Sequence, residues 1–270
     1  MIMGDKYIPI DEVTFVEKGF LWGEGEESRP RFKIKVPHFM AGWDGYQAWE
    51  KERFDSMEAN LKQGDVLFDI GSETGWMSVI YGKIVGPENV CLFEPVNENW
   101  PNILATWEEN FGNVKPLRAC ACLVSDKTTA IESSDGRLIN FARHPEFDKG
   151  IWPARAYGDH MLDARKYQYV HEHAHETPQI SIDDFVYQSG IVPRGITIDV
   201  EGAEYLVLKG AQKTLGHIRP LVWVSVHEDQ MKRNYDNTPE QISAWMHGLG
   251  YSQEKLAEDH EVHMFYRPLP

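Results

Sequence analysis

Basic residues are scarce in this chain: 27 lysines and arginines stand against 42 aspartates and glutamates, so the formal net charge is -15 over 270 residues. Such a surface repels phosphate backbones and anionic lipids. We therefore expect no nucleic acid and no membrane among the partners of this chain. A small cationic ligand suits the charge better.

Cysteine is also scarce. The three cysteines, Cys91, Cys120 and Cys122, are too few for a disulfide framework and lack the paired spacing of a zinc site. The first residues show no basic segment followed by an apolar run and a cleavage site. No apolar stretch approaches the ~20 residues that cross a bilayer. We expect a cytoplasmic protein with buried, reduced thiols.

From position 46 onward, apolar residues alternate between strand-like and helix-like patterns. Short, nearly continuous apolar runs are typical of parallel strands buried on both faces. We expect strands at 66–70, 89–94, 114–124, 196–200 and 221–226, an antiparallel edge strand at 262–266, and helices at 46–61, 75–85, 97–110, 203–215 and 239–249. This order predicts an α/β fold with a doubly wound, mostly parallel sheet.

Two parts of the chain lack this alternation. Residues 1–45 mix short apolar pieces with glycine, proline and charge, and we interpret them as an N-terminal elaboration. The main domain then covers residues 46–270. Within it, residues 134–177 lose the pattern over a length that exceeds an ordinary connection. We predict that they form an insertion or lid beside the site.

The segment from Asp69 to Gly75 reads Asp-Ile-Gly-Ser-Glu-Thr-Gly and joins a predicted strand to a predicted helix. Gly71 and Gly75 let the backbone approach a ligand closely because they have no Cβ. The spacing differs from the G-x-G-x-x-G of dinucleotide folds, which holds a pyrophosphate. The carboxylates of Asp69 and Glu73 suit instead a ligand with a positive amino or sulfonium group. Taken alone, the segment is equally compatible with an ordinary turn.

Glu94 ends the next predicted strand, roughly 20 residues beyond the glycine turn. A carboxylate there can accept hydrogen bonds from both hydroxyls of a ribose. The alternative is a solvated strand end. Because ligands of such sheets bind beyond the carboxyl ends of the strands, we expect Glu94 and the glycine turn to share one site.

Several blocks in this order resemble the FkbM-like S-adenosylmethionine-dependent methyltransferases. Residues 66–71 with Gly75 are similar to the first cofactor motif of the family, and Phe93-Glu94-Pro95 is similar to its acidic second-strand motif. Its most distinctive stretch is matched by residues 181–185, 198–204 and 207–210. The run Asp-Val-Glu-Gly-Ala-Glu at 199–204 is the most specific of these blocks.

The resemblance implies a class I methyltransferase (Rossmann-like) fold with an antiparallel C-terminal hairpin. It also implies S-adenosyl-L-methionine as cofactor and a hydroxyl group of a sugar, glycan or small metabolite as acceptor. The glycine turn and the resemblance together give the expected cofactor residues, which are Asp69, Gly71, Ser72, Glu73, Gly75, Glu94, Asp126 and Asp199. Among them, Glu94 would hold the ribose and Asp126 would lie on the adenine side. Asp199 and Glu201 would face the methyl donor and the acceptor.

Methyl transfer is an in-line displacement at a sulfonium carbon, so the enzyme must align donor and acceptor and remove the hydroxyl proton. His227 follows a predicted strand at the same edge and has a reference pKa suited to a general base. Asp199 or Glu201 are the other candidates for this catalytic role. His227 is also compatible with a hydrogen-bonded strand end, and Asp199 with a cap of the following helix.

Two positions depart from the family pattern: Thr197, where lysine is frequent, and Ser225, where glutamate is frequent. They leave open a non-catalytic module that only binds the cofactor. The buried strand, glycine turn and acidic second strand are also compatible with an NAD(P)-dependent oxidoreductase. However, the nearest approach to a dinucleotide fingerprint, Gly23-Glu24-Gly25, follows no adequate strand, so the sequence favours a methyltransferase.

Histidine alternates with other residues from His171 to His175. On a strand, all three histidines of this run would share one face and could bind a metal; on a helix, only the first and last would align. The run lies in the weakly patterned insertion. We interpret it as a loop that is solvated or contacts the acceptor, and the sequence assigns no metal site.

Overall fold

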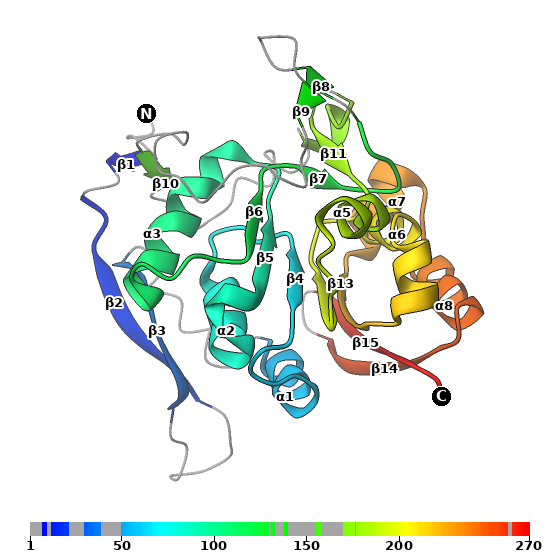
Figure 1. Cartoon of the computed structure of the whole chain (residues 1–270), viewed down its shortest axis with the longest axis horizontal. Helices are drawn as coiled ribbons and strands as arrows, with labels where there is room; N and C mark the ends of the chain where they lie inside the picture. The colour runs from blue at the N-terminus through cyan, green and yellow to red at the C-terminus, as the bar shows by residue number, and fades with distance from the viewer. Residues whose placement is uncertain are drawn as a thin grey trace.

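The computed structural model describes residues 7–9, 12–21, 30–38, 50–129, 131–132, 138–139, 155–157, 170–175, 177–258 and 261–270. Its centre is a seven-stranded sheet of order β14-β15-β13-β12-β4-β5-β6 (Figure 1). The bounds are β4 (Leu67–Ile70), β5 (Val90–Phe93), β6 (Arg118–Cys120), β12 (Gly195–Ile198), β13 (Leu221–Val226), β14 (Tyr251–Glu258) and β15 (Val262–Pro268). Neighbouring strands from β6 to β13 are parallel, whereas β15 is antiparallel to both β13 and β14. The predicted α/β class, with a mostly parallel sheet and an antiparallel C-terminal hairpin, is confirmed.

The prediction that residues 262–266 form the edge of the sheet is wrong. Strand β15 is antiparallel as expected, but it lies between β13 and β14, and β14 is the edge. Residues 252–255 of β14 are Ser-Gln-Glu-Lys and are exposed. An edge strand with polar side chains has no apolar run that would reveal it in the sequence.

Helices cover both faces of the sheet. One face packs against α1 (Lys51–Asn60), α2 (Trp76–Val85) and α3 (Trp100–Phe111), and the other against α5 (Ile182–Ser189), α6 (Glu204–Lys209), α7 (Glu228–Tyr235) and α8 (Pro239–Gly248). Side chains alternate along each strand. On β4, Leu67 therefore joins the first core, and Phe68 and Ile70 join the second. Each fully buried side chain of this kind contributes about 1.5–3 kcal/mol.

Several predicted boundaries shift in the structure. Helix α1 begins at Lys51, and residues 46–49 of the predicted helix lie outside the described residues. The predicted strand at 114–124 is divided into β6 and β7 (Leu123–Val124), and β7 pairs with β11 (Gln179–Ile180) outside the main sheet. A 3-10 turn, η5 (Asn97–Asn99), precedes α3, and a π-helical turn, η8 (Thr214–Ile218), follows α6.

The N-terminal segment forms a hairpin of β2 (Phe15–Leu21) and β3 (Pro30–Pro37). Its β3 is tied to α3, because the Asn110 side chain accepts from the Lys35 amide and donates to the Lys35 carbonyl. Strand β1 (Tyr7–Pro9) pairs with β10 (Arg155–Tyr157), and β8 (Ile131–Glu132) pairs with β9 (Leu138–Ile139). Most of the predicted insertion at 134–177 lies outside the described residues, so its role as a lid stays a prediction. Within the described part of the chain, no helix is long and apolar enough to span a bilayer.

Candidate active site

The turn after β4 brings the backbone of Gly71 against the end of β12. Gly71 has a φ of 95°, and a Cβ on it would lie 1.8 Å from the main-chain oxygen of Asp199. Only glycine fits a left-handed backbone this close to a neighbour. The Gly71 amide donates to Phe93 O at 2.9 Å, and the Asp199 amide donates to Ile70 O at 2.9 Å. The turn therefore lies between β5 and β12, where the strand order reverses.

The rest of the turn is held by main-chain hydrogen bonds. Ser72 is buried, and its amide donates to Phe93 O at 3.1 Å. Gly75 is the N-cap of α2 with a φ of 81°, and a Cβ on it would lie 3.0 Å from the Cα of Ile103 in α3. Glycine at this position therefore allows α2 and α3 to pack closely.

Glu94 is 1% exposed, and both of its carboxylate oxygens accept backbone hydrogen bonds. The Glu73 amide donates to Oε2 at 2.9 Å, and the Val96 amide donates to Oε1 at 2.8 Å. Burial raises the pKa of Glu94 to about 7, although the two amides favour the charged form. Glu73 has a left-handed φ of 50°. Because each oxygen of Glu94 has a second lone pair, the group can accept ribose hydroxyls while it is held in place.

Asp69 faces α2 rather than the end of the strand. Side chains alternate along β4, so Asp69 shares the face of Leu67, which packs against α1–α3. Its Oδ2 accepts a hydrogen bond from Ser78 Oγ at 2.5 Å, and burial raises its pKa to about 6. The structure therefore places Asp69 beneath the predicted cofactor site.

A cavity opens at the carboxyl ends of β4, β5 and β12. Of the predicted cofactor residues, Gly71, Glu94 and Asp199 line it. Phe93 and Val124 contribute to an apolar part of the wall. A ligand with a ribose, a positive centre and a flat base matches this combination of carboxylates and apolar surface. The residues present thus fit S-adenosylmethionine.

Asp126 is not brought together with these residues. It is exposed, and its Oδ2 lies 3.1 Å from Lys209 Nζ. Both side chains line a separate hollow near Asp183 and Gly210. The reason is that β7, which precedes Asp126, leaves the main sheet to pair with β11.

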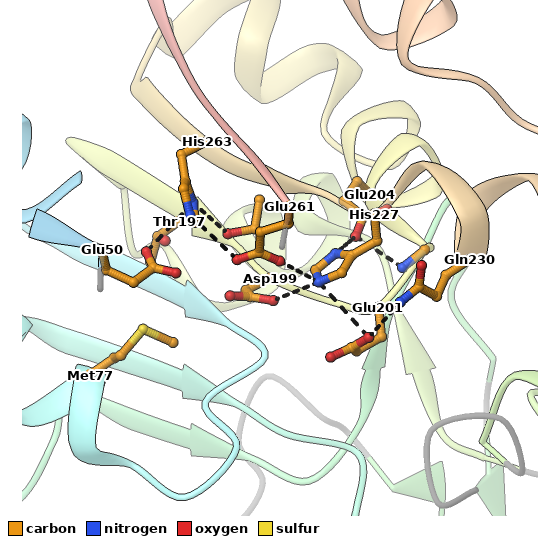
Figure 2. Close-up of polar contacts among 12 residues, drawn as sticks. Glu50, Met77, Thr197, Asp199, Glu201, Glu204, His227, Gln230, Glu261 and His263 are labelled. Carbon is orange, nitrogen blue, oxygen red and sulfur yellow. Dashed lines mark hydrogen bonds and ion pairs between the residues drawn. The ribbon is translucent and has the colours of Figure 1, made fainter. Parts of the chain in front are cut away.

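His227 lies at the end of β13 within a group of carboxylates (Figure 2). Its Nε2 is 3.7 Å from Asp199 Oδ1 and 3.8 Å from Glu201 Oε2, and it contacts Oε2 of Glu261. On the other side of the ring, Nδ1 is 2.8 Å from Oε1 of Glu204. The structure therefore brings the three predicted catalytic residues, Asp199, Glu201 and His227, together.

The surroundings of His227 affect its chemistry. Burial lowers its pKa, but hydrogen bonds to Glu204 and Glu261 outweigh burial and hold the pKa well above its ordinary value. An imidazole that donates from both nitrogens has no free lone pair with which to accept a proton. The side chain of Glu201 is 36% exposed, and burial raises its pKa. Glu201 is thus the more accessible proton acceptor in the cluster.

A buried arginine lies beside this cluster. Arg53 on α1 is 2% exposed, and its guanidinium donates to Ser225 Oγ at 2.8 Å, to Glu50 at 2.9 Å and to Thr197 Oγ1. It also lies 3.4 Å from Asp199 Oδ2. Thr197 and Ser225 are the two positions at which the chain departs from the family pattern. The hydroxyls of both residues accept hydrogen bonds from one guanidinium, which comes from a helix outside the motifs.

Sequence reasoning missed Glu261 and His263, which are 6% and 1% exposed. Glu261 bridges two histidines: its Oε2 contacts His227, and its Oε1 lies 3.7 Å from His263 Nε2. The sequence signal that could have revealed both residues is their spacing. Glu261 and His263 are two residues apart, and residues two apart on a strand share a face.

The histidine run of the predicted insertion is not assembled into one site. His171 Nδ1 lies 2.6 Å from the hydroxyl of Tyr235, and burial lowers the pKa of His171 to about 4. The rings of His173 and His175 stack on each other, with centroids 6.4 Å apart. His171 lines the cavity, so one member of the run reaches the site.

A sequence model of the methyltransferase FkbM domain matches residues 69–252, which include the glycine turn, Glu94, Asp199 and His227. The chain belongs to the FkbM methyltransferase family. The predicted membership is confirmed, as is S-adenosylmethionine as the cofactor. An NAD(P)-dependent oxidoreductase, the alternative left open by the sequence, does not fit a member of this family.

Similar solved structures include the FkbM methyltransferase of Methylobacillus flagellatus KT, with a TM-score of 0.48 and 14% identity over 75% of this chain and 43% of that one. M. jannaschii TYW2 in complex with AdoMet has a TM-score of 0.42 and 11% identity over 92% of this chain and 90% of that one. Precorrin-6y C5,15-methyltransferase of Geobacter metallireducens GS-15 has a TM-score of 0.41 and 9% identity over 80% and 86%. The chain thus spans less than half of the Methylobacillus protein. Comparison with curated proteins gives no match.

Proposed function

We propose that this methyltransferase transfers the methyl group of S-adenosylmethionine to a hydroxyl oxygen of a small, uncharged acceptor such as a sugar. The observation that carries the proposal is that Glu201 and His227 gather around Asp199, which lines the same cavity as Gly71 and Glu94. Proton removal from a hydroxyl requires a base, and this cluster supplies one where the sheet binds its ligands.

On the donor side, Glu94 accepts the ribose hydroxyls, and the backbone at Gly71 permits close approach of the methionine part. Asp199 places negative charge near the sulfonium centre. S-adenosylmethionine supplies an electrophilic methyl group. The fixed amides of Glu73 and Val96 hold the Glu94 carboxylate before the donor arrives, so little ordering of this side chain accompanies binding.

On the acceptor side, the hydroxyl oxygen forms a bond to the methyl carbon while the carbon–sulfur bond breaks and its electron pair stays on sulfur. The hydroxyl proton passes to Glu201, the most open carboxylate around His227. Asp199 and His227 orient the hydroxyl. An anionic acceptor would be repelled by Asp199, Glu201 and Glu261, which favours a neutral polyhydroxy compound.

The test combines donor binding with turnover. We expect calorimetry to show that Glu94→Ala weakens S-adenosylmethionine binding about 10- to 100-fold, because a hydrogen bond to a charged group contributes about 1.5–3 kcal/mol. Glu98→Ala, an exposed control four residues away, leaves binding unchanged. Release of S-adenosylhomocysteine with a panel of sugars then reports transfer. If methyl groups reached only nitrogen, sulfur or carbon acceptors, the oxygen assignment would be wrong.

A further inference from the structure

Asp199, His227 and Glu261 form a compact set of possible metal ligands. One ligand atom from each lies within 4.8 Å of the other two. The three residues come from the ends of β12 and β13 and from the residue before β15, so three separate chain segments converge on one point. Figure 2 shows the carboxylates of Asp199 and Glu261 directed at the same ring nitrogen of His227.

The orientation of His227 supports a ligand role. Its Nδ1 lies 2.8 Å from Oε1 of Glu204, a carboxylate with no solvent exposure. Oε1 of Glu204 also accepts the Gly202 amide at 2.9 Å, which fixes the carboxylate in turn. Metal-binding histidines commonly donate their second N–H to a carboxylate in this way, which directs the other nitrogen at the ion. Glu204 thus leaves Nε2 of His227 turned toward Asp199 and Glu261.

The local charge also favours a cation. Asp199, Glu204 and Glu261 are buried or half-buried together. The neighbouring guanidinium of Arg53 is engaged with Glu50, Thr197 and Ser225, and its distance to Asp199 is 3.4 Å. Buried carboxylates are normally paired or bound to a metal. A dication between Asp199 and Glu261 would offset their charge without moving Arg53.

We propose that Asp199, His227 and Glu261 bind one divalent cation of the Mn²⁺ or Mg²⁺ class, which takes the acceptor hydroxyl as a further ligand. Two carboxylates and one imidazole form an oxygen-rich set that suits such ions. The inference rests on the proposed function. Binding to the ion lowers the pKa of the hydroxyl, whose proton leaves to Glu201.

A second set of possible ligands, Glu50, Glu261 and His263, shares one carboxylate with the first. Nη1 of Arg53 lies 2.9 Å from Oε2 of Glu50, so a cation in that set would face a buried guanidinium. The same guanidinium lies farther from the first set, 3.4 Å from Oδ2 of Asp199, and repulsion between like charges grows as they come closer. The charge distribution therefore selects the His227 set, and His263 provides a matched control.

Binding of Mn²⁺ to the chelator-treated chain, followed by electron paramagnetic resonance without donor or acceptor, tests the proposal. We expect one ion per chain, nitrogen modulation from an imidazole ligand in the pulsed spectrum, and competition by Mg²⁺. His227→Gln should remove the nitrogen signal, Asp199→Asn should weaken binding at least 10-fold, and His263→Gln should keep both signal and affinity. The wild-type spectrum needs no variant, so a misfolded substitution does not decide the result.

The outcomes separate this proposal from the proposed function. Absence of Mn²⁺ binding, or a nitrogen signal that His263→Gln removes and His227→Gln leaves, would overturn the metal site. Full transfer to oxygen by the chelator-treated chain would overturn the role of the ion while leaving the proposed function intact. If the chain bound Mn²⁺ through His227 but methylated no hydroxyl, the metal site would stand and the proposed oxygen acceptor would be wrong.

Discussion

Gly71 and Gly64 allow the cost of a left-handed backbone to be separated from the cost of close packing. Their φ values are 95° and 90°, but only at Gly71 would a Cβ meet another atom, Asp199 O at 1.8 Å; at Gly64 nothing lies within 4 Å. We expect Gly64→Ala to cost about 1–2 kcal/mol of unfolding free energy, the penalty of the left-handed region. Gly71→Ala should cost clearly more and weaken donor binding. Urea unfolding and calorimetry of both variants measure the difference, and equal losses would contradict this account of the turn.

Loss of Glu201 or His227 should slow methyl transfer, whereas loss of Glu94 should weaken donor binding. Glu201→Gln keeps the shape of the side chain and removes the base, so we expect the turnover rate to fall about 10²- to 10⁴-fold. His227→Ala should also slow transfer, because it removes the group that Asp199 and Glu261 contact. Both variants should bind the donor as the wild type does. Glu228→Gln changes an exposed residue next to His227 and is the control, which should turn over as the wild type does. Donor binding lost together with turnover would place Glu201 on the donor side instead.

At the scale of elements, α1 is anchored to the sheet through Arg53. The side chain links Glu50, the N-cap residue of α1, to Thr197 on β12 and Ser225 on β13. We expect Arg53→Met to cost about 3–5 kcal/mol of unfolding free energy, because the buried Glu50 loses its charged partner at 2.9 Å and is left with the more distant Nδ1 of His263 at 3.6 Å. Adding Glu50→Gln should recover part of this loss. Lys51→Met, which removes a half-exposed pair with Asp55 on the same helix, should cost less than about 1 kcal/mol in the same urea titration. Similar losses for Arg53→Met and Lys51→Met would show that the buried network does not anchor the helix.

The elements that the sequence predicts well are those with a strong apolar pattern. Strands β4, β5 and β13 are buried along their whole length, and each lies within its expected range. Helix α7 was not predicted, because Met231 is its one fully buried residue and the other positions are polar or charged. A segment of this composition has too few apolar residues to predict a helix from their spacing. The exposed strand β14 was missed for the same reason.

The site residues that the sequence predicts are likewise those attached to strands with a strong apolar pattern. Gly71, Glu94, Asp199 and His227 each follow a buried parallel strand, and the carboxyl ends of such strands meet at one edge. Arg53 and Glu261 come from α1 and from the loop before β15 instead. Their positions depend on how a helix and an antiparallel hairpin pack against the sheet. No local sequence pattern predicts this packing. Asp126 shows the converse, since pairing of β7 with β11 removes it from an edge that the chain order suggested.

For the whole molecule, the excess of acidic groups predicts how stability depends on pH. Burial raises the pKa of Glu94 from 4.5 to about 7 in the folded chain, while the unfolded chain keeps the ordinary value. Between these values the folded state holds a proton that the unfolded state has released. The stabilising contribution is therefore complete below the unfolded pKa and is lost as the pH rises through about 7.

Glu94→Gln removes this titration while other buried acids, such as Asp69, remain in both proteins. We expect the unfolding free energy of the wild type to fall more steeply than that of Glu94→Gln between pH 5 and 8, by up to about 1.4 kcal/mol per pH unit. The slopes matter here, because the changed hydrogen bonds from the amides of Glu73 and Val96 also alter the absolute stability of the variant. Urea titrations at several pH values measure both curves. Parallel curves would mean that Glu94 is ionised throughout this range, and its carboxylate would then be ready to accept the ribose of the donor without releasing a proton.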